Sequence, residues 1–505
     1  MIVAGVGQID IAKEGKDKSF GTIGQLVAEK ALNDLDSRAT RKGVDNVNVN
    51  KKLAIVFGYT PAGIKSNLEE LIKGIKDTIG DIPLIGTSSA AEIGTERVTK
   101  NSVVCMLLAS DALLLGVECA KFDDHTYEGI RKTGNDIVES AFDGLRKDIL
   151  RSPLLQAIGR AFLIESADLV WKHLPSGFVL MFPSFPPIVR FSPKPDNLIK
   201  GVADYLGPYT PIAGGLPGSG TQTPGGETYV FFNDEVLSEA VACAVFLNLA
   251  SFGFGIDLGF VPNGKKYRIT EVEGTKNHIN MGYKVLKIDD IEAPRSLYER
   301  SKSYYDLPCP DWLLNLMREK GYKNKSYEDW IKIATEQRVT DLDILYYMHP
   351  YGFVDRFGEL HAIAPYRITE KSLEFGIKLP EDLTLYDLTL GEKWEDIEKN
   401  VKESVKRAVK KALADTEVKK EDVDAVLVFS CCLRHWYFDK EDPEVELKAI
   451  KEEFKGLDIP IIGFYTQGEI NRFPGDRSEF LNHTFSVLLL SKKFRFPIGG
   501  RVGGD

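Results

Sequence analysis

The richest group of chemically capable side chains lies late in the chain: Cys431, Arg434, His435, Tyr465 and Glu469. All of them follow short apolar runs that predict buried strands, so we expect them on loops at one edge of a sheet. Arg434 could hold a carboxylate through two parallel hydrogen bonds, and Glu469 could receive an ammonium group. Together they would suit a zwitterion. The alternative is that the two charges pair with each other and fasten two loops.

The same cluster also permits a catalytic interpretation. Cys431 or Cys432 could be a nucleophile with His435 or His483 as its base, which requires a thiolate and an imidazole within hydrogen-bond reach. No catalytic signature surrounds these cysteines, and a cysteine after a buried strand commonly packs as a small apolar side chain. We therefore prefer ligand binding, with a cysteine-dependent hydrolase or transferase as the alternative.

Two further groups could contact the same kind of ligand. Asn482 and His483 begin the last predicted strand, although a histidine satisfied by nearby backbone is an equally good interpretation. Ser88, Ser89 and Glu92 follow an early predicted strand and could form an N-terminal counterpart. Serines at a turn commonly hydrogen-bond to the local backbone, which is the competing interpretation there.

The sequence predicts neither a cofactor nor a metal ion. Cysteine, histidine and carboxylate residues lack metal-ligand spacing, and the glycine-rich stretch 214–226 lacks the lysine of a phosphate-binding loop. The formal net charge is −10, and no basic stripe suggests nucleic-acid binding. No signal-peptide pattern begins the chain, and no apolar run approaches the ~20 residues that span a bilayer. We therefore expect a cytoplasmic protein that does not contact membranes.

An internal repeat predicts how the candidate residues are positioned. Residues 82–93 and 459–470 match without a gap, share an Ile-Pro-x-Ile-Gly sequence and place a glutamate at the same position. A weaker third copy spans residues 178–233 and has Gly220 at that position. The pattern predicts strand–helix–strand units whose turns lie beyond the carboxyl ends of the strands, where α/β sheets bind ligands.

Apolar periodicity predicts the remaining elements and the fold class. We expect an α/β protein with two domains built from repeated strand–helix–strand units, in which mixed sheets are flanked by helices. The expected helices cover residues 22–35, 67–79, 126–150, 153–163, 196–206, 238–249, 310–347, 394–413 and 444–454. The expected strands cover residues 53–57, 82–86, 102–108, 178–182, 210–214, 229–233, 267–272, 284–288, 373–379, 384–388, 425–429, 459–463 and 484–490.

Motifs along nearly the whole chain resemble the FIST family, named for F-box and intracellular signal transduction proteins. Residues from about 20 to 250 resemble its N-terminal domain, and residues from about 251 to 492 resemble its C-terminal domain. The N-terminal resemblance rests on residues 85–93 (IGTSSAAEI) and the strand at 102–108. The C-terminal resemblance rests on residues 429–434 (FSCCLR), 463–470 (GFYTQGEI) and 482–484 (NHT).

The resemblance implies domains at residues 1–250 and 251–495, with a helical insertion at about 310–350 and a flexible tail at 496–505. It also implies a sensory module for a small molecule, such as an amino acid, that passes its signal to a partner protein. A protein-interaction scaffold without a ligand is the third possibility. The residues predicted to contact the ligand are Arg434, Glu469, Tyr465, Cys431, His483, Asn482, Ser88, Ser89 and Glu92.

Overall fold

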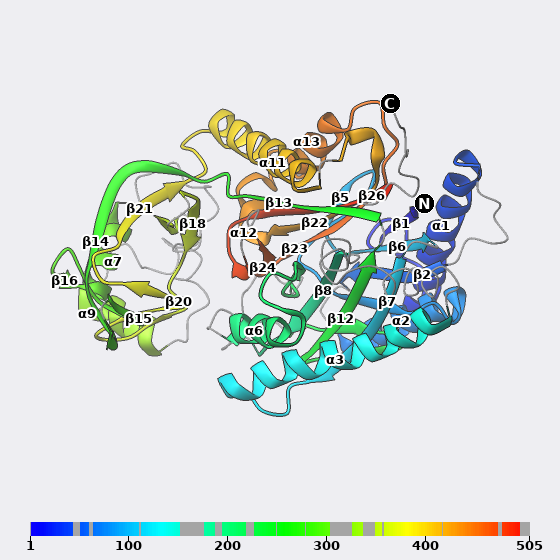
Figure 1. Ribbon diagram of the computed structural model, residues 1–505. Helices are drawn as coiled ribbons and strands as arrows, with labels where there is room; N and C mark the ends of the chain where they lie inside the picture. Colours follow the sequence, from blue (N-terminus) through cyan, green and yellow to red (C-terminus); the bar gives the residue numbers. More distant parts are fainter. Residues whose placement is uncertain are drawn as a thin grey trace, which may run out of the picture.

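The structure, a computed structural model, is an α/β protein with mixed sheets flanked by helices, as predicted. Figure 1 shows three sheets with long helices outside them and, on the left, a smaller lobe made mainly of strands. The residues that the structure describes are 2–43, 51–59, 64–110, 113–151, 176–186, 194–218, 227–248, 250–277, 279–303, 326–336, 349–355, 358–416, 418–472 and 477–494.

Three six-stranded sheets share one strand order. In each, two long antiparallel strands lie beside a pair of parallel strands. The first sheet contains β1 (Ile2–Asp10), β6 (Ser102–Ser110), β2 (Lys51–Gly58) and β3 (Leu84–Ser88). The second contains β7 (Leu113–Lys121), β12 (Ala240–Asn248), β8 (Ser176–Ser184) and β9 (Ile212–Gly215). The third contains β13 (Ala250–Asp257), β26 (Phe485–Phe494), β22 (Val423–Cys431) and β23 (Ile461–Thr466).

Each sheet is completed by two short strands from elsewhere in the chain. These are β10 (Val230–Phe232) and β11 (Glu235–Leu237) in the first sheet, β24 (Glu469–Arg472) and β25 (Ser478–Leu481) in the second, and β4 (Glu92–Ile93) and β5 (Val98–Thr99) in the third. The sheets are therefore interlocked, because residues 92–99 lie in the same sheet as residues 423–494. The division of the chain at residue 250 stays a prediction.

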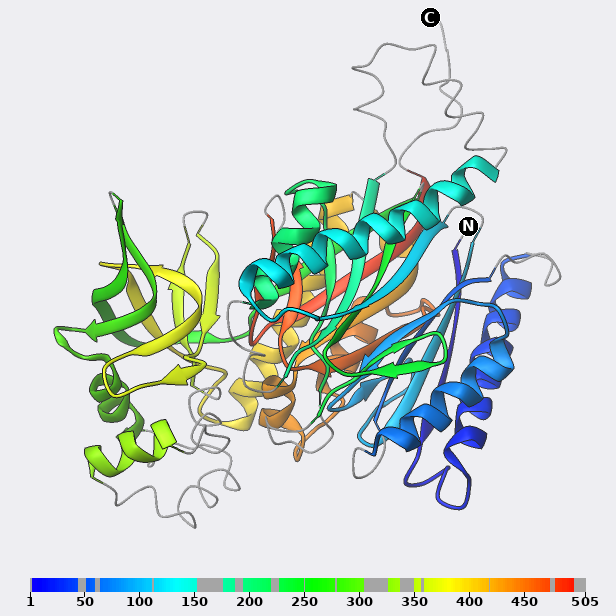
Figure 2. The same cartoon turned by 90° about the horizontal axis from the view of Figure 1, so that it is seen from below.

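The inner faces of the three sheets enclose one apolar core. Phe57, Phe182 and Phe429 occupy equivalent positions on β2, β8 and β22, and their ring centroids lie 5.4, 6.1 and 6.4 Å apart. The outer faces pack against helix pairs, which is why these strands are apolar on both sides (Figure 2). The pairs are α1 (Phe20–Arg41) with α2 (Lys65–Ile79), α3 (Tyr127–Arg151) with α6 (Lys194–Leu206), and α11 (Trp394–Thr416) with α13 (Val445–Glu453).

A glycine in the third strand of each unit allows this close packing. A Cβ on Gly86, Gly214 or Gly463 would lie 1.9, 1.9 or 2.3 Å from a carbonyl oxygen of the parallel neighbouring strand. No larger residue fits such an approach, which explains the glycine of the Ile-Pro-x-Ile-Gly sequences.

The smaller lobe lies between β13 and α11 in the sequence, and we call its eight-stranded antiparallel sheet the insertion sheet. The predicted strands at 267–272 and 284–288 are confirmed and pair antiparallel, Ile269 with Ile288 and Val272 with Val285. The strands are β14 (Val261–Asn277), β15 (Ile279–Ile288), β16 (Ile291–Glu292), β17 (Tyr351–Val354), β18 (Leu360–Ile363), β19 (Arg367–Ile368), β20 (Leu373–Pro380) and β21 (Thr384–Thr389). The lobe also holds the helices α7 (Ala293–Lys302) and α9 (Tyr327–Glu336).

Two predictions about the third copy are wrong. Residues 238–249 are not a helix, because Ala240–Asn248 form β12 between two antiparallel neighbours, where both faces are buried. Residues 229–233 are not the last strand of that copy. They contain β10, which takes the place that β4 and β24 take in the other copies.

Several predicted segments lie outside the described residues: the helix at 153–163, the tail at 496–505 and most of the helical insertion at 310–347. Within the last of these, α9 is helical as predicted. Among the described helices, none is long and apolar enough to cross a membrane.

Candidate functional site

Arg434 is fully buried, and every nitrogen of its guanidinium donates a hydrogen bond within the protein. Its Nε lies 2.9 Å from Glu446 Oε1, and its Nη2 lies 2.8 Å from Ser404 Oγ. Its Nη1 donates to the carbonyl of Leu258, where the chain leaves β13 for the insertion sheet. Arg434 is the third residue of α12 (Cys432–Phe438), which begins directly after β22. The predicted ion pair between Arg434 and Glu469 is therefore wrong, because Arg434 pairs with Glu446 instead.

Glu469 is also fully buried and has partners of its own. Its carboxyl accepts a hydrogen bond from the Thr466 hydroxyl, and it accepts two from Thr484, from the backbone nitrogen at 3.0 Å and from Oγ1 at 2.8 Å. Burial raises the pKa of Glu469 well above its usual range. The carboxyl therefore favours its neutral form, which is a poor receptor for an ammonium group.

Glu92 repeats this arrangement in the first copy. Its carboxyl accepts hydrogen bonds from the Ser89 hydroxyl, from the Ser102 backbone nitrogen at 3.1 Å and from Ser102 Oγ at 2.6 Å. Burial raises the pKa of Glu92 to about 8. Ser88 bonds to the local backbone, since its Oγ donates to the Gly218 carbonyl at 3.0 Å. The serines of this turn thus hold the chain together in the described structure.

The third copy replaces the glutamate with an apolar residue. Glu92, Glu469 and Val230 each pair with the residue that follows the glycine in the third strand of the neighbouring sheet. Val230 is therefore the equivalent residue, whereas the predicted Gly220 lies outside the described residues.

The hydroxyl partner is replaced as well. Ser102 and Thr484 stand at the start of the last strand of their copies, and Ala240 has that position in the third. Each follows a non-glycine residue in the left-handed region, with φ of 53°, 65° and 50° respectively. The equivalent residue pair is thus polar in the first and last copies (Glu92 with Ser102, Glu469 with Thr484) and apolar in the third (Val230 with Ala240).

Cys431 does not have the surroundings of an activated nucleophile. Its thiol is buried, and burial raises its pKa well above the usual value. Burial also lowers the pKa of His435 to about 4, and the His435 ring lies 4.3 Å from the ring of Tyr465. The Tyr465 side chain is fully buried, and burial followed by the nearby Glu446 raises its pKa. These side chains form a buried cluster around Arg434.

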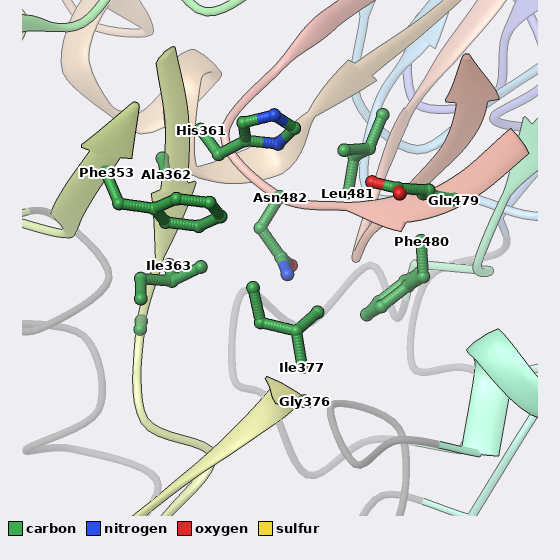
Figure 3. A pocket seen from close by; sticks show the side chains of 11 residues that line it. Phe353, His361, Ala362, Ile363, Gly376, Ile377, Glu479, Phe480, Leu481 and Asn482 are labelled. Atoms are coloured by element: carbon green, nitrogen blue, oxygen red, sulfur yellow. The ribbon is translucent and has the colours of Figure 1, made fainter. Parts of the chain in front are cut away.

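Asn482 differs from the other predicted contacts because it lines a pocket. The pocket has a volume of about 50 Å³ and lies between β25 and the strands β18 and β20 of the insertion sheet. Figure 3 shows the Asn482 amide pointing between Ile377, Ile363 and Phe480. Among the residues that the structure describes, none hydrogen-bonds to this amide. It is a half-buried polar group in a pocket whose side chains are mainly apolar, so a ligand that enters the pocket could hydrogen-bond to it.

The remaining wall of the pocket is aromatic and carries few polar groups. The rings of Phe353 and His361 stack with centroids 4.9 Å apart. His361 Nε2 lies 3.1 Å from Asp355 Oδ2, so its polar edge is engaged. Glu479 is exposed and stands at the rim.

A short path joins the pocket to the buried clusters. After Asn482, His483 has a φ of 65° and packs edge-on against Phe260 with ring centroids 5.3 Å apart. Thr484 follows and binds Glu469. Phe260 lies at the entrance to the insertion sheet, two residues after the carbonyl that Arg434 holds. The pocket, the two carboxyl clusters of the last copy and the base of the insertion sheet are thus in contact.

Sequence reasoning missed Glu446 and the walls of the pocket. Glu446 lies on the same face of α13 as Ala449 and Ile450, both buried, and a charged residue on an apolar helix face was the available signal. Phe353, Ile363 and Ile377 lie far from Asn482 in sequence, so no local pattern connects them. Among the described residues, no group of histidine, cysteine and carboxylate side chains could hold a metal ion.

Comparison with known proteins places these features in a family. Residues 52–279 match the FIST N domain, and residues 325–472 match the FIST C domain. Both are sensory domains of signal transduction, which is consistent with a sensing role. It belongs to the FIST family, as the sequence motifs indicated.

Similarity to other proteins is remote. No protein of curated function matches the chain. Among solved structures, cyanuric acid hydrolase from A. caulinodans is 9% identical with a TM-score of 0.25, over 51% of this chain and 72% of that one. PurL of T. maritima complexed with FGAR is 9% identical with a TM-score of 0.21, over 97% and 73%. Thiamine monophosphate kinase from Aquifex aeolicus is 11% identical with a TM-score of 0.14, over 40% and 70%. Scores this low support no statement about this chain.

Proposed function

We propose that this protein is a cytoplasmic small-molecule sensor of the FIST type, that its ligand occupies the pocket beside Asn482, and that it passes its state to a partner protein. The proposal rests mainly on the Asn482 amide, which faces the pocket and has no hydrogen-bond partner among the described residues. Pockets with apolar walls and a few polar groups are the usual form of small-molecule sites, and they often lie between two parts of a protein.

The buried clusters are weaker candidates for direct ligand contact. To bind a zwitterion there, Arg434 would have to leave Glu446, and Glu469 would have to ionise while buried. Breaking a buried ion pair costs several kcal/mol, which a small ligand would have to supply. These residues support the site instead by fixing the chain on either side of it.

The insertion sheet is the part that would report ligand binding. It joins the three-sheet core through two connections, and each contains a glycine with positive φ, Gly259 at 75° and Gly391 at 149°. Such residues can absorb backbone rotation at a hinge. A ligand held between Asn482 and the insertion sheet would favour one position of the lobe over another, and a partner that contacts the lobe would detect the difference.

Thermal-shift measurements with a panel of metabolites test the proposal. A ligand that binds only the native state raises Tm by mass action, by the equivalent of about 2.7 kcal/mol at 100 times Kd. Ala364→Phe would fill the pocket that Ala364 lines, and Val354→Phe introduces the same side chain at a residue that is 42% exposed. The proposal predicts a metabolite whose shift survives in Val354→Phe and disappears in Ala364→Phe. A panel without such a metabolite would contradict it and would favour the scaffold interpretation.

A further inference from the structure

The polar chemistry of the pocket constrains the class of ligand, given the proposed function on which this inference rests. We infer that the sensed molecule is uncharged and presents a carboxamide-like edge, with one donor and one acceptor side by side, together with a compact apolar group. The inference departs from the zwitterionic amino acid that the sequence suggested.

The first step is the hydrogen-bonding capacity of Asn482. Its side chain offers a carbonyl acceptor and an NH₂ donor in one plane. A carboxamide or a lactam presents the complementary pair and can satisfy both at once. A group that offers only donors or only acceptors leaves one half of the amide without a partner from the ligand, which weakens binding.

The second step is the charge around the pocket. The described residues that line it include no lysine and no arginine. Among these residues a ligand carboxylate would meet no cation, and it would approach Glu479 at the rim. The imidazole of His361 is already engaged with Asp355 at 3.1 Å. An unpaired charge in such surroundings is strongly disfavoured, whereas a neutral ligand carries no such penalty.

The third step is the size of the pocket. Its volume of about 50 Å³ is several times the ~15 Å³ that a single water requires. It therefore has room for roughly three water-sized groups, which restricts the ligand to a small molecule. The apolar part of the ligand lies against Ile363, Ile377 and Phe480, whose branched and aromatic side chains suit a short aliphatic chain.

Four probes of similar size separate the possible charge states: propionamide, propionate, propylammonium and zwitterionic alanine. Each is titrated against the full chain at fixed ionic strength, and Tm is recorded. We expect propionamide to raise Tm at concentrations at least tenfold lower than the other three. The shift should be lost in Ala364→Phe and kept in Val354→Phe.

Variants of Asn482 test the recognition itself. Asn482→Leu should weaken propionamide at least tenfold, because both hydrogen bonds are lost. Asn482→Asp should reverse the preference toward propylammonium, because the donor is replaced by a negative charge. Stronger pocket-dependent binding of propionate, propylammonium or alanine to the natural chain would overturn the inference and leave the sensor proposal standing. Failure of all four probes, together with a metabolite panel that gives no pocket-dependent shift, would overturn both.

Discussion

The interior around Arg434 and the pocket around Asn482 lie close together and treat polar groups in opposite ways. Arg434, Glu446 and Glu469 carry formal charges in sequence, yet in the fold they are fully buried and bonded to one another or to hydroxyls. Asn482 carries no charge and is only half-buried, yet its amide has no partner among the described residues. These three charged side chains thus stabilise the fold, whereas the neutral Asn482 amide, which has no partner among the described residues, lines the proposed ligand pocket.

The largest effect should come from breaking the Arg434 cluster. Arg434→Ala leaves Glu446 buried without its cation and frees the Leu258 carbonyl, so we expect a loss of about 3–5 kcal/mol in the free energy of unfolding. Denaturant unfolding measures it. The matched control is Arg407→Ala, since Arg407 pairs with Asp257 but is half-exposed, and its loss should cost under about 1 kcal/mol. Equal costs for the two arginines would refute the structural role of Arg434.

A second prediction transfers the apolar pair of the third copy, Val230 and Ala240, to the equivalent positions of the first copy. Glu92→Val alone should cost about 2–4 kcal/mol, because the hydroxyl and the backbone nitrogen of Ser102 lose their acceptor and a cavity remains. Adding Ser102→Ala reproduces the Val230 and Ala240 pair, and the double variant should recover about 1 kcal/mol relative to additivity. A double-mutant cycle measures this coupling. If the two substitutions destabilise the protein additively, the apolar pair cannot replace the polar pair in the first copy.

Local sequence predicts some elements of this fold correctly and others wrongly. The apolar runs at 53–57 and 425–429 were assigned correctly, because continuous burial leaves a direct signature. The run at 238–249 was misassigned, since small and apolar residues buried on both faces carry no period that separates a strand from a helix. The exchange of short strands between sheets depends on contacts between distant segments, so no local sequence pattern predicts it.

The candidate site was predictable in outline only. The sequence predicted Arg434 and Glu469 on loops after neighbouring strands, but Arg434 lies in α12 and Glu469 is the first residue of β24. Spacing along the chain also does not specify their partners. Asn482 was named for its place before the last strand, whereas its importance comes from walls that the insertion sheet supplies. The pocket lies between residues 479–482 and the insertion sheet, which are far apart in the sequence, so only the three-dimensional structure shows it.

A third prediction follows from the raised pKa of Glu92. Its carboxyl titrates near 4.5 when unfolded and at about 8 when folded, so the folded protein holds the proton more tightly. Stability from this group is fully present below pH 4.5 and is lost as the pH rises to about 8, by up to about 1.4 kcal/mol per pH unit. Glu92→Gln stays neutral and should therefore gain stability relative to the natural chain across this window. Unfolding curves from pH 5 to 8 measure the gain, with the exposed Glu392→Gln as the control that should show no such trend.

The smallest effect on stability should come from Asn482→Leu. The amide has no partner among the described residues, so replacing it strands no other group, and the change should stay within about 0.5 kcal/mol. Denaturant unfolding measures this as well. A loss above about 2 kcal/mol would show that Asn482 holds the fold in the way that Arg434 does.

The most direct test of the account compares ligand response in Asn482→Leu and Glu469→Gln. Glu469→Gln keeps a neutral side chain in a site that already favours the neutral form, so both variants should fold. With propionamide as the probe, the Tm shift should vanish in Asn482→Leu and remain within about twofold of the natural chain in Glu469→Gln. The reverse pattern, a shift kept in Asn482→Leu and abolished in Glu469→Gln, would place the ligand in the buried cluster and contradict the account.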